Sequence, residues 1–131
     1  MIKERKYGMN QQNSQELMKC IVRAADDRLG QDILALDVQN LTPLADYFVL
    51  VTAKNDRQLQ AIVESIEEAM EGAGYTIKSK EGQAGTRWYL LDCTDVVVHV
   101  FTKDEREHYH LEKLWSDAPI VNLEGILSDE A

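Results

Sequence analysis

The segment from Arg87 to Phe101 constrains the fold more than any other part of this sequence. Two apolar runs rich in β-branched and aromatic residues meet there at a short polar break. This pattern predicts two antiparallel strands, over residues 87–92 and 95–101, joined as a hairpin. His99 interrupts the second apolar run, so it is a candidate for either a structural or a chemical role.

Hydrophobic periodicity predicts further helices and strands outside this hairpin. The clearest helix follows Asn55, where Gln58 three residues later gives a capping-box-like start, and it ends at Gly72. A first helix has Ser14 as its predicted N-cap and Gly30 as its stop. This first helix covers Gln15–Leu29. The other predicted elements are strands Ile33–Val38, Tyr47–Thr52 and Tyr75–Ser79, and helix Asp104–Leu114.

The resulting order is α-β-β-α-β-β-β-α, which predicts an α/β fold with a mixed β-sheet of about five strands flanked by helices. The run from Tyr47 to Thr52 is apolar throughout, as expected for a central strand covered on both faces. A chain of 131 residues fits one domain, which we place at residues 13–116. Residues 1–12 are predicted to be a flexible N-terminal lead or upstream extension, and residues 117–131 an acidic C-terminal tail.

The sequence is acidic, with 14 Lys and Arg against 23 Asp and Glu, for a formal net charge of −9. This charge disfavours direct nucleic-acid binding and favours a basic partner, although acidity can also serve solubility alone.

Two isolated cysteines, Cys20 and Cys93, match no metal or redox spacing and suit a reducing cytoplasm. We also expect no membrane association, because the longest apolar run is far shorter than the ~20 residues of a spanning helix.

The candidate catalytic groups do not form a recognisable pattern. Asp92 and Asp95 flank the hairpin turn and Asp46 precedes the central strand. Paired carboxylates can bind a metal for phosphoryl transfer, but Asp is also favoured in turns. His99 can likewise act as a general base or as a hydrogen-bonded structural imidazole. We therefore predict a protein without catalytic residues, metal or cofactor, in which Asp46, Asp95 and His99 are structural.

Aromatic side chains offer a binding surface. Trp88, Tyr89, Tyr109 and Trp115 are of the types enriched at interface hot spots. Tyr109 and Trp115 share a predicted helix with apolar neighbours, which favours a core position for both. Trp88 opens a strand beside a polar loop, where an exposed edge would offer a docking site. Both the core and the surface interpretation of Trp88 remain open at this level.

A set of short motifs follows one particular order along residues 14–116. They are Leu41-Thr42, Ala45-Asp46-Tyr47-Phe48-Val49, Arg57-Gln58, Glu81-Gly82, Trp88, Leu91-Asp92, Asp95 through Phe101, and Tyr109, Leu111-Glu112 and Leu114-Trp115. Through them the chain resembles the ribosomal silencing factor family, also called the Iojap-related family.

The resemblance implies a sheet with flanking helices, similar in shape to nucleotidyltransferases but without their activity. It implies binding to the large ribosomal subunit through ribosomal protein L-fourteen, which blocks subunit joining and slows translation when nutrients are scarce. It makes Trp88 the expected anchor of this contact. The neighbouring candidates, which cannot all face one partner because side chains alternate along a strand, are Glu81, Tyr89, Leu90 and Asp92. The residues expected to be structural are Asp46, Asp95, His99 and Trp115.

The sequence departs from the family pattern in two turns. Cys93-Thr94 replaces a hairpin pair that usually contains glycine, which leaves the turn type open. Residues 52–55 replace a Ser- or Gly-rich loop.

Two further hypotheses stand beside the silencing factor. One is a nucleotide-binding enzyme of the same fold that acts near Asp92 and Asp95, and the other is a homodimer formed through the ribosome-binding edge.

Overall fold

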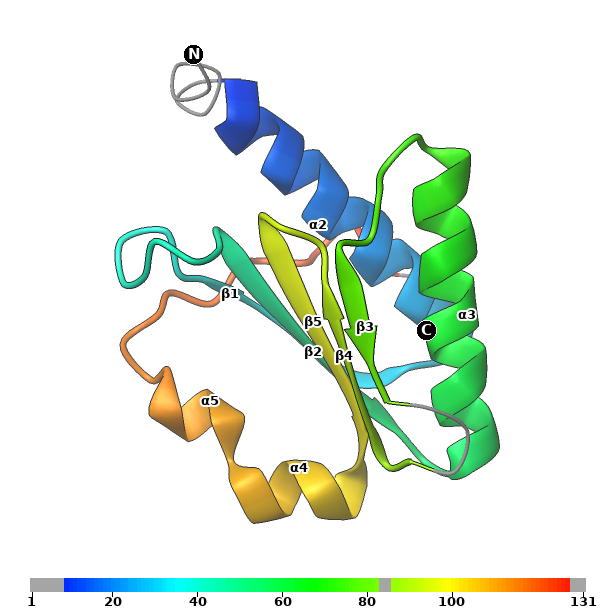
Figure 1. Ribbon diagram of the computed structural model, residues 1–131. Helices are drawn as coiled ribbons and strands as arrows, with labels where there is room; N and C mark the ends of the chain where they lie inside the picture. The colour runs from blue at the N-terminus through cyan, green and yellow to red at the C-terminus, as the bar shows by residue number, and fades with distance from the viewer. Residues whose placement is uncertain (1–8, 83–85, 128–131) are drawn as a thin grey trace.

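A five-stranded mixed sheet with the strand order β1-β2-β5-β4-β3 lies at the centre of the protein (Figure 1). The computed structural model describes residues 9–82 and 86–127. It confirms the predicted α/β class and the mixed sheet of five strands. The strands are β1 (Gln31–Asp37), β2 (Tyr47–Ala53), β3 (Ser79–Glu81), β4 (Trp88–Asp92) and β5 (Val96–Thr102), and the helices are α2 (Met9–Asp27), α3 (Asp56–Gly72), α4 (Lys103–Tyr109) and α5 (Leu111–Leu114).

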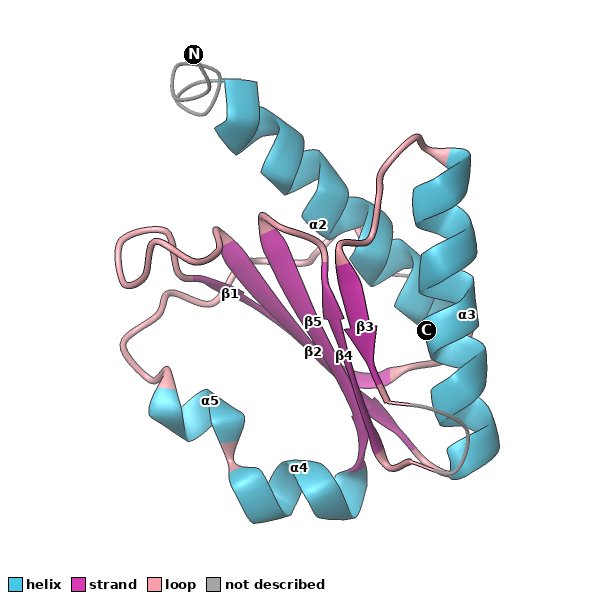
Figure 2. Ribbon diagram, viewed as in Figure 1, coloured by secondary structure: helices cyan, strands magenta, loops and turns pink. Residues whose placement is uncertain are grey.

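The two central strands, β2 and β5, run parallel, in register from Tyr47 opposite Val96 to Ala53 opposite Thr102. All the other strand pairs are antiparallel. Six of the seven β2 residues are buried, which confirms the prediction of a central strand covered on both faces. Helix α3 follows β2 on one side of the sheet, and α4 follows β5 on the other (Figure 2).

The long helices α2 and α3 cover one face and form the main core with it. α3 has the predicted cap, because the Asn55 side chain accepts a hydrogen bond from the Gln58 N–H at 2.8 Å. Its buried side chains recur at helical spacing, as predicted. The largest fully buried side chains of this core are Met18, Ile21, Leu59, Ile62, Ile66, Met70 and Leu91.

The opposite face is covered only in part, by α4, α5 and the segment that follows them. A smaller core lies beneath these short helices. It comprises Leu36, Val38, Ala45, Leu50, Phe101 and Ala118, with Leu34, Phe48, Trp88, Val97, Leu111 and Trp115 packed against it. The sheet is therefore covered unevenly, by two long helices on one face and two short ones on the other.

The described part of the C-terminal segment follows the edge of β1. The Pro119 carbonyl accepts from the Asp37 N–H at 2.9 Å, and the Val121 N–H donates to the Ala35 carbonyl at 2.9 Å. Leu123 then packs into the main core. These contacts pair backbone groups of β1 that would otherwise lie at an open sheet edge.

Three predicted boundaries differ from the structure. α2 begins at Met9, so Ser14 lies inside the helix and is buried, and its prediction as N-cap is wrong. The first eight residues of the predicted lead lie outside the described residues. β3 lies at Ser79–Glu81 instead of Tyr75–Ser79, because pairing with β4 fixes its position. The last predicted helix is divided at His110, whose φ of 50° ends α4.

The predicted hairpin is confirmed, and its turn uses no glycine. Thr94 adopts a φ of 71°, and its N–H donates to Asp92 Oδ1 at 2.9 Å. The Cys93 N–H donates to the Val96 carbonyl at 2.9 Å. A side chain that accepts a hydrogen bond in the turn thus offsets part of the cost of a positive φ at a non-glycine residue.

Gly82→Ala is expected to lower the free energy of unfolding by about 2 kcal/mol, because it adds strain and overpacking together. Gly82 has a φ of +115°, and a Cβ there would lie 2.8 Å from Tyr89 Cδ1 and 3.0 Å from the Trp88 carbonyl oxygen. Gly72→Ala is the matched control, since a Cβ at that helical position meets nothing within 4 Å. It should leave stability unchanged or raise it by up to about 1 kcal/mol. Urea denaturation measures both, and equal effects would contradict the structure.

Candidate functional site

Four of the five predicted contact residues lie on one face of the sheet. β4 alternates between half-buried and buried residues, so Trp88, Leu90 and Asp92 face away from α2 and α3. Glu81 lies opposite Leu90 in the β3–β4 register and shares that face. We call this surface, opposite α2 and α3, the open face. Its strand residues include Phe48, Leu50, Glu81, Trp88, Leu90, Asp92, Val97, His99 and Phe101.

Tyr89 is the exception among the predicted contacts. It is only 3% exposed and packs in the main core, on the face covered by α2 and α3. The Lys80 ammonium lies 5.8 Å from its ring centroid and forms a 2.9 Å ion pair with Glu67 of α3. The structure therefore separates Tyr89 from Trp88 and Leu90, as the alternation of side chains along a strand requires.

Trp88 is half-buried on the open face and is held by several contacts. Its Nε1–H donates to His99 Nδ1 at 3.1 Å. Its ring lies 4.7 Å from the ring of Tyr109 and 5.4 Å from that of Phe101, measured between centroids. β4 pairs with β5 along its whole length and with β3 from Leu90 to Asp92. A partner at this position would therefore meet the Trp88 ring beside a part of β4, Trp88 and Tyr89, that has no partner residue in the β3 register.

The short helices add aromatic and apolar surface around Trp88. Tyr109 is 48% exposed, so its prediction as a core residue is wrong. Trp115 is half-buried and packs edge-on against Phe48, with centroids 4.9 Å apart. Leu114, which sequence reasoning did not select, is 73% exposed. The chain leaves its helical path at His110, and this break sets the positions of Tyr109, Leu114 and Trp115. No local sequence pattern predicts the break.

His99 lies beneath this surface as a neutral imidazole. Burial lowers its pKa to about 4 from an ordinary value of 6.5. Its Nδ1 accepts the Trp88 hydrogen bond, which requires that nitrogen to be unprotonated. His99 also lies against the rings of Phe48 and Phe101. These contacts fit the predicted structural role, because they orient the Trp88 ring.

The remaining candidate groups serve the backbone at the start of β2. The Asp95 carbonyl in the hairpin turn accepts from the Asp46 N–H at 2.7 Å and from the Tyr47 N–H at 3.2 Å. Burial raises the pKa of the Cys93 thiol to about 12, so it stays protonated.

Within residues 9–82 and 86–127, no three His, Cys, Asp or Glu side chains are placed to hold a metal ion. None of the described helices is long and apolar enough to cross a bilayer.

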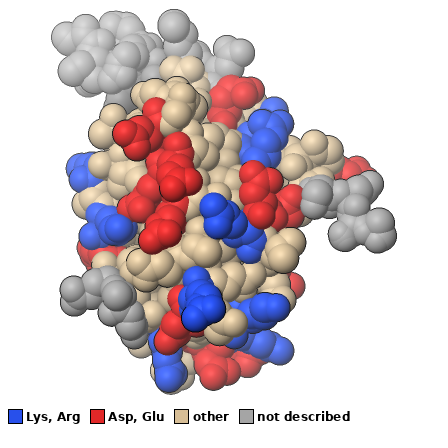
Figure 3. All heavy atoms as spheres, turned by 90° about the vertical axis from the view of Figure 1, so that its right-hand side faces the viewer, with Lys and Arg blue, Asp and Glu red and all other residues tan. Residues whose placement is uncertain are grey.

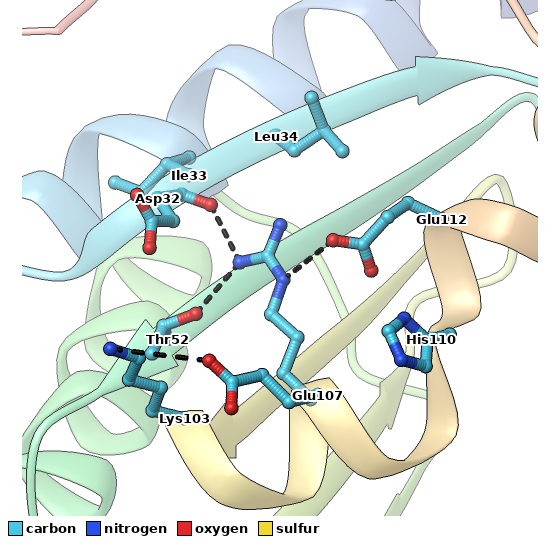
Figure 4. Close-up of a pocket in the computed structure, with 9 residues that line it drawn as sticks. Asp32, Ile33, Leu34, Thr52, Lys103, Glu107, His110 and Glu112 are labelled. Carbon is cyan, nitrogen blue, oxygen red and sulfur yellow. Dashed lines mark hydrogen bonds and ion pairs between the residues drawn. The ribbon is translucent and has the colours of Figure 1, made fainter.

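A cleft of about 450 Å³ lies between α4, α5 and the β1–β2 pair (Figure 4). Its principal side chain is Arg106, which is 9% exposed. Arg106 Nη1 donates to the Asp32 carbonyl and to Thr52 Oγ1, both at 2.7 Å, and Nε donates to Glu112 Oε2 at 3.1 Å. One guanidinium thus connects α4 to β1, β2 and α5. Sequence reasoning missed it, because its strand partners are more than 50 residues away.

The arrangement supports binding better than chemistry. Arg106 is committed to holding the short helices on the sheet, and His99 is committed to Trp88. What remains accessible on the open face is an aromatic and apolar patch, Trp88, Leu90 and Tyr109, with the carboxylates of Glu81 and Asp92 beside it. Such a patch is suited to contact with another macromolecule.

Stability should fall as pH decreases from 7 to 5, because the unfolded chain protonates His99 while the folded state resists it. The folded pKa is the lower one, so the stability is present above 6.5 and is lost toward pH 4. The loss at pH 5 is about 2 kcal/mol. Urea denaturation at both pH values measures it, and His99→Gln should remove most of the difference. An unchanged slope in that variant would contradict this assignment.

Arg106→Met should lower the free energy of unfolding by about 3 kcal/mol, since it strands the buried Thr52 hydroxyl and the Glu112 carboxylate. Lys103→Met is the control, because Lys103 is exposed and 3.9 Å from Glu107. That change should stay within about 0.5 kcal/mol. Thermal and urea unfolding measure both variants. Similar losses would refute the role of Arg106 as a clamp that holds α4 and α5 on β1 and β2.

Comparison with known proteins gives one consistent family. A family model described as "Ribosomal silencing factor during starvation" matches residues 11–131. The ribosomal silencing factor of Bacillus subtilis is 45% identical over 112 residues, which cover 86% of this chain and 95% of that protein. The one from Halalkalibacterium halodurans is 43% identical over 116 residues, covering 88% and 99%.

Solved structures agree with this result. A crystal structure of a Chromobacterium violaceum protein superposes with a TM-score of 0.77 at 36% identity, covering 79% of this chain and 86% of that one. A Bacillus halodurans crystal structure gives 0.74 at 40% identity, covering 83% and 99%. Sequence and fold together therefore show that the chain belongs to the ribosomal silencing factor family.

Proposed function

We propose that this chain binds the large ribosomal subunit through its open face, docks on ribosomal protein L-fourteen, and so prevents the small subunit from joining. The observation that carries the proposal is the Trp88–Tyr109 pair, an aromatic surface in which Trp88 of β4 is half-buried and Tyr109 of α4 is exposed. The family name supports a ribosomal target. We place this action in the cytoplasm, where the subunits meet.

The Trp88 ring is ordered before any partner arrives. The hydrogen bond to His99 and the contacts with Phe101 and Tyr109 fix its orientation. Binding therefore costs little additional side-chain entropy at this position. Tryptophan and tyrosine are also the residues that most often dominate interface energies. This preorganisation supports Trp88 as the anchor of the docking surface.

Charge supports a basic partner. The chain carries a formal net charge of −9, and Glu81 and Asp92 lie on the same face as Trp88. Opposite charge accelerates encounter and orients the two surfaces as they approach. A ribosomal protein with exposed lysines and arginines fits this surface. Leu90 lies between the two carboxylates and adds apolar contact.

Silencing by this route needs no reaction on a substrate. A protein that occupies the joining face of the large subunit excludes the small subunit by volume alone. The free energy of docking then decides how many subunits are held apart. Repression of translation follows from occupancy, and it reverses when the protein dissociates.

Trp88→Ala is expected to weaken binding to purified large subunits about 30-fold, a loss of about 2 kcal/mol, because it removes the aromatic anchor. Co-sedimentation over a protein concentration series measures the dissociation constant. Tyr89→Phe is the matched control on the same strand, since Tyr89 is buried on the opposite face and should leave binding unchanged. Circular dichroism confirms that both variants remain folded.

The same preparation tests the consequence for the ribosome. Wild-type protein added to separated subunits should lower the fraction of joined ribosomes in a sucrose gradient, and Trp88→Ala should restore it. Wild-type protein that does not sediment with large subunits at low salt would refute the proposed function. Binding without any effect on joining would refute the steric mechanism alone.

A further inference from the structure

A second cleft, of about 570 Å³, lies at the carboxyl ends of the two parallel strands. β2 leads into α3 on one face of the sheet, and β5 leads into α4 on the other. Two adjacent parallel strands whose connections diverge in this way leave a crevice beyond their carboxyl ends. In α/β folds this is the usual position of a binding site. The lining residues are Lys54, Asn55, Asp56, Arg57, Arg87, Thr102 and Asp104.

Three cations from separate parts of the chain line this cleft. Lys54 and Arg57 come from the β2–α3 connection, and Arg87 comes from the residue before β4. All three are exposed, and none forms an ion pair with the residues the structure describes. Figure 3 shows several Lys and Arg side chains toward the lower end of the α3 side, with acidic side chains among them. The cleft is thus a local basic site on an acidic protein.

The balance of charge in the cleft limits its ligand. Asp56 and Asp104 also line it, so the three cations leave a net charge of +1. That matches one phosphodiester group, which carries a single negative charge. A free nucleoside polyphosphate carries several negative charges. These would be repelled by Asp56, Asp104 and the acidic surface of the protein. The ligand that fits best is one phosphate within a larger molecule, whose other contacts supply most of the affinity.

The cleft borders the open face. Arg87 immediately precedes Trp88, and its carbonyl accepts a hydrogen bond from the Thr102 N–H at 3.1 Å. This bond connects the start of β4 to the end of β5, where the Trp88 ring packs against Phe101. A large partner that contacts Trp88 therefore has its neighbouring surface at the cleft.

We propose that this cleft receives one backbone phosphate of ribosomal RNA when the open face docks on the large subunit. The inference rests on the proposed function and adds a second contact to it. Phosphate contacts fix position and orientation without reading sequence. The net charge of the chain still opposes extended binding along RNA. A single basic site beside a protein-binding face avoids that repulsion and fixes the angle at which the protein docks.

The test compares complete large subunits with isolated ribosomal protein L-fourteen, each over a series of salt concentrations. The double variant Arg57→Gln/Arg87→Gln should weaken binding to subunits about 10-fold at low salt and reduce the salt slope of log K by about 0.7 to 0.9. Its binding to isolated L-fourteen should stay within about twofold of wild type, because that partner contributes no RNA phosphate. Arg23→Gln on α2 is the control for a lost surface charge and should change neither interaction.

Each other outcome is decisive. An unchanged salt slope for the double variant, with Trp88→Ala still defective, would overturn the phosphate site and leave the proposed function intact. Equal weakening toward subunits and isolated L-fourteen would assign the cleft to a protein contact and overturn the inference. Failure of wild-type protein to bind subunits would overturn both proposals together. Urea denaturation of the double variant confirms folding, as expected for two exposed side chains.

Discussion

The parallel pairing of β2 with β5 is the constraint on which the rest of this structure depends. Both strands are interior to the sheet, and their side chains feed two cores at once. Each strand is followed by a helix, and the two helices lie on opposite faces. The helices on one face have 19 and 17 residues, and those on the other have 7 and 4. This unequal cover leaves part of the open face accessible, and the second cleft lies at its border.

Two polar contacts hold the accessible side in a defined shape. The clamp at Arg106 fixes α4 and α5 to β1 and β2, and the bond from Trp88 to His99 fixes the ring that we propose as the anchor. Both involve a buried polar group that would be costly to leave unpaired. The proposed binding surface is therefore already formed by the fold of the free protein. The proposed phosphate site extends the same surface with charges that stay solvated until docking.

Elements with a strong local pattern could be predicted from the sequence, as α3 with its Asn55 cap and the hairpin of β4 and β5 show. Elements positioned by distant partners could not, since β3 is placed by its pairing with β4. The same division holds for the site. Alternation along β4 correctly implied that the predicted contacts would divide between two faces. The contacts of Arg106 depend on tertiary packing and left no signal in the sequence.

Side-chain oxidation footprinting of the protein, free and bound to large subunits, tests the central claim most directly. Our account predicts that Trp88 and Tyr109 of the open face become protected on binding. Tyr75, which packs against the main core on the α2–α3 side, should keep the reactivity it has in the free protein. Protection of Tyr75 with unchanged oxidation of Trp88 and Tyr109 would contradict the account, because the protein would then dock through its helical side.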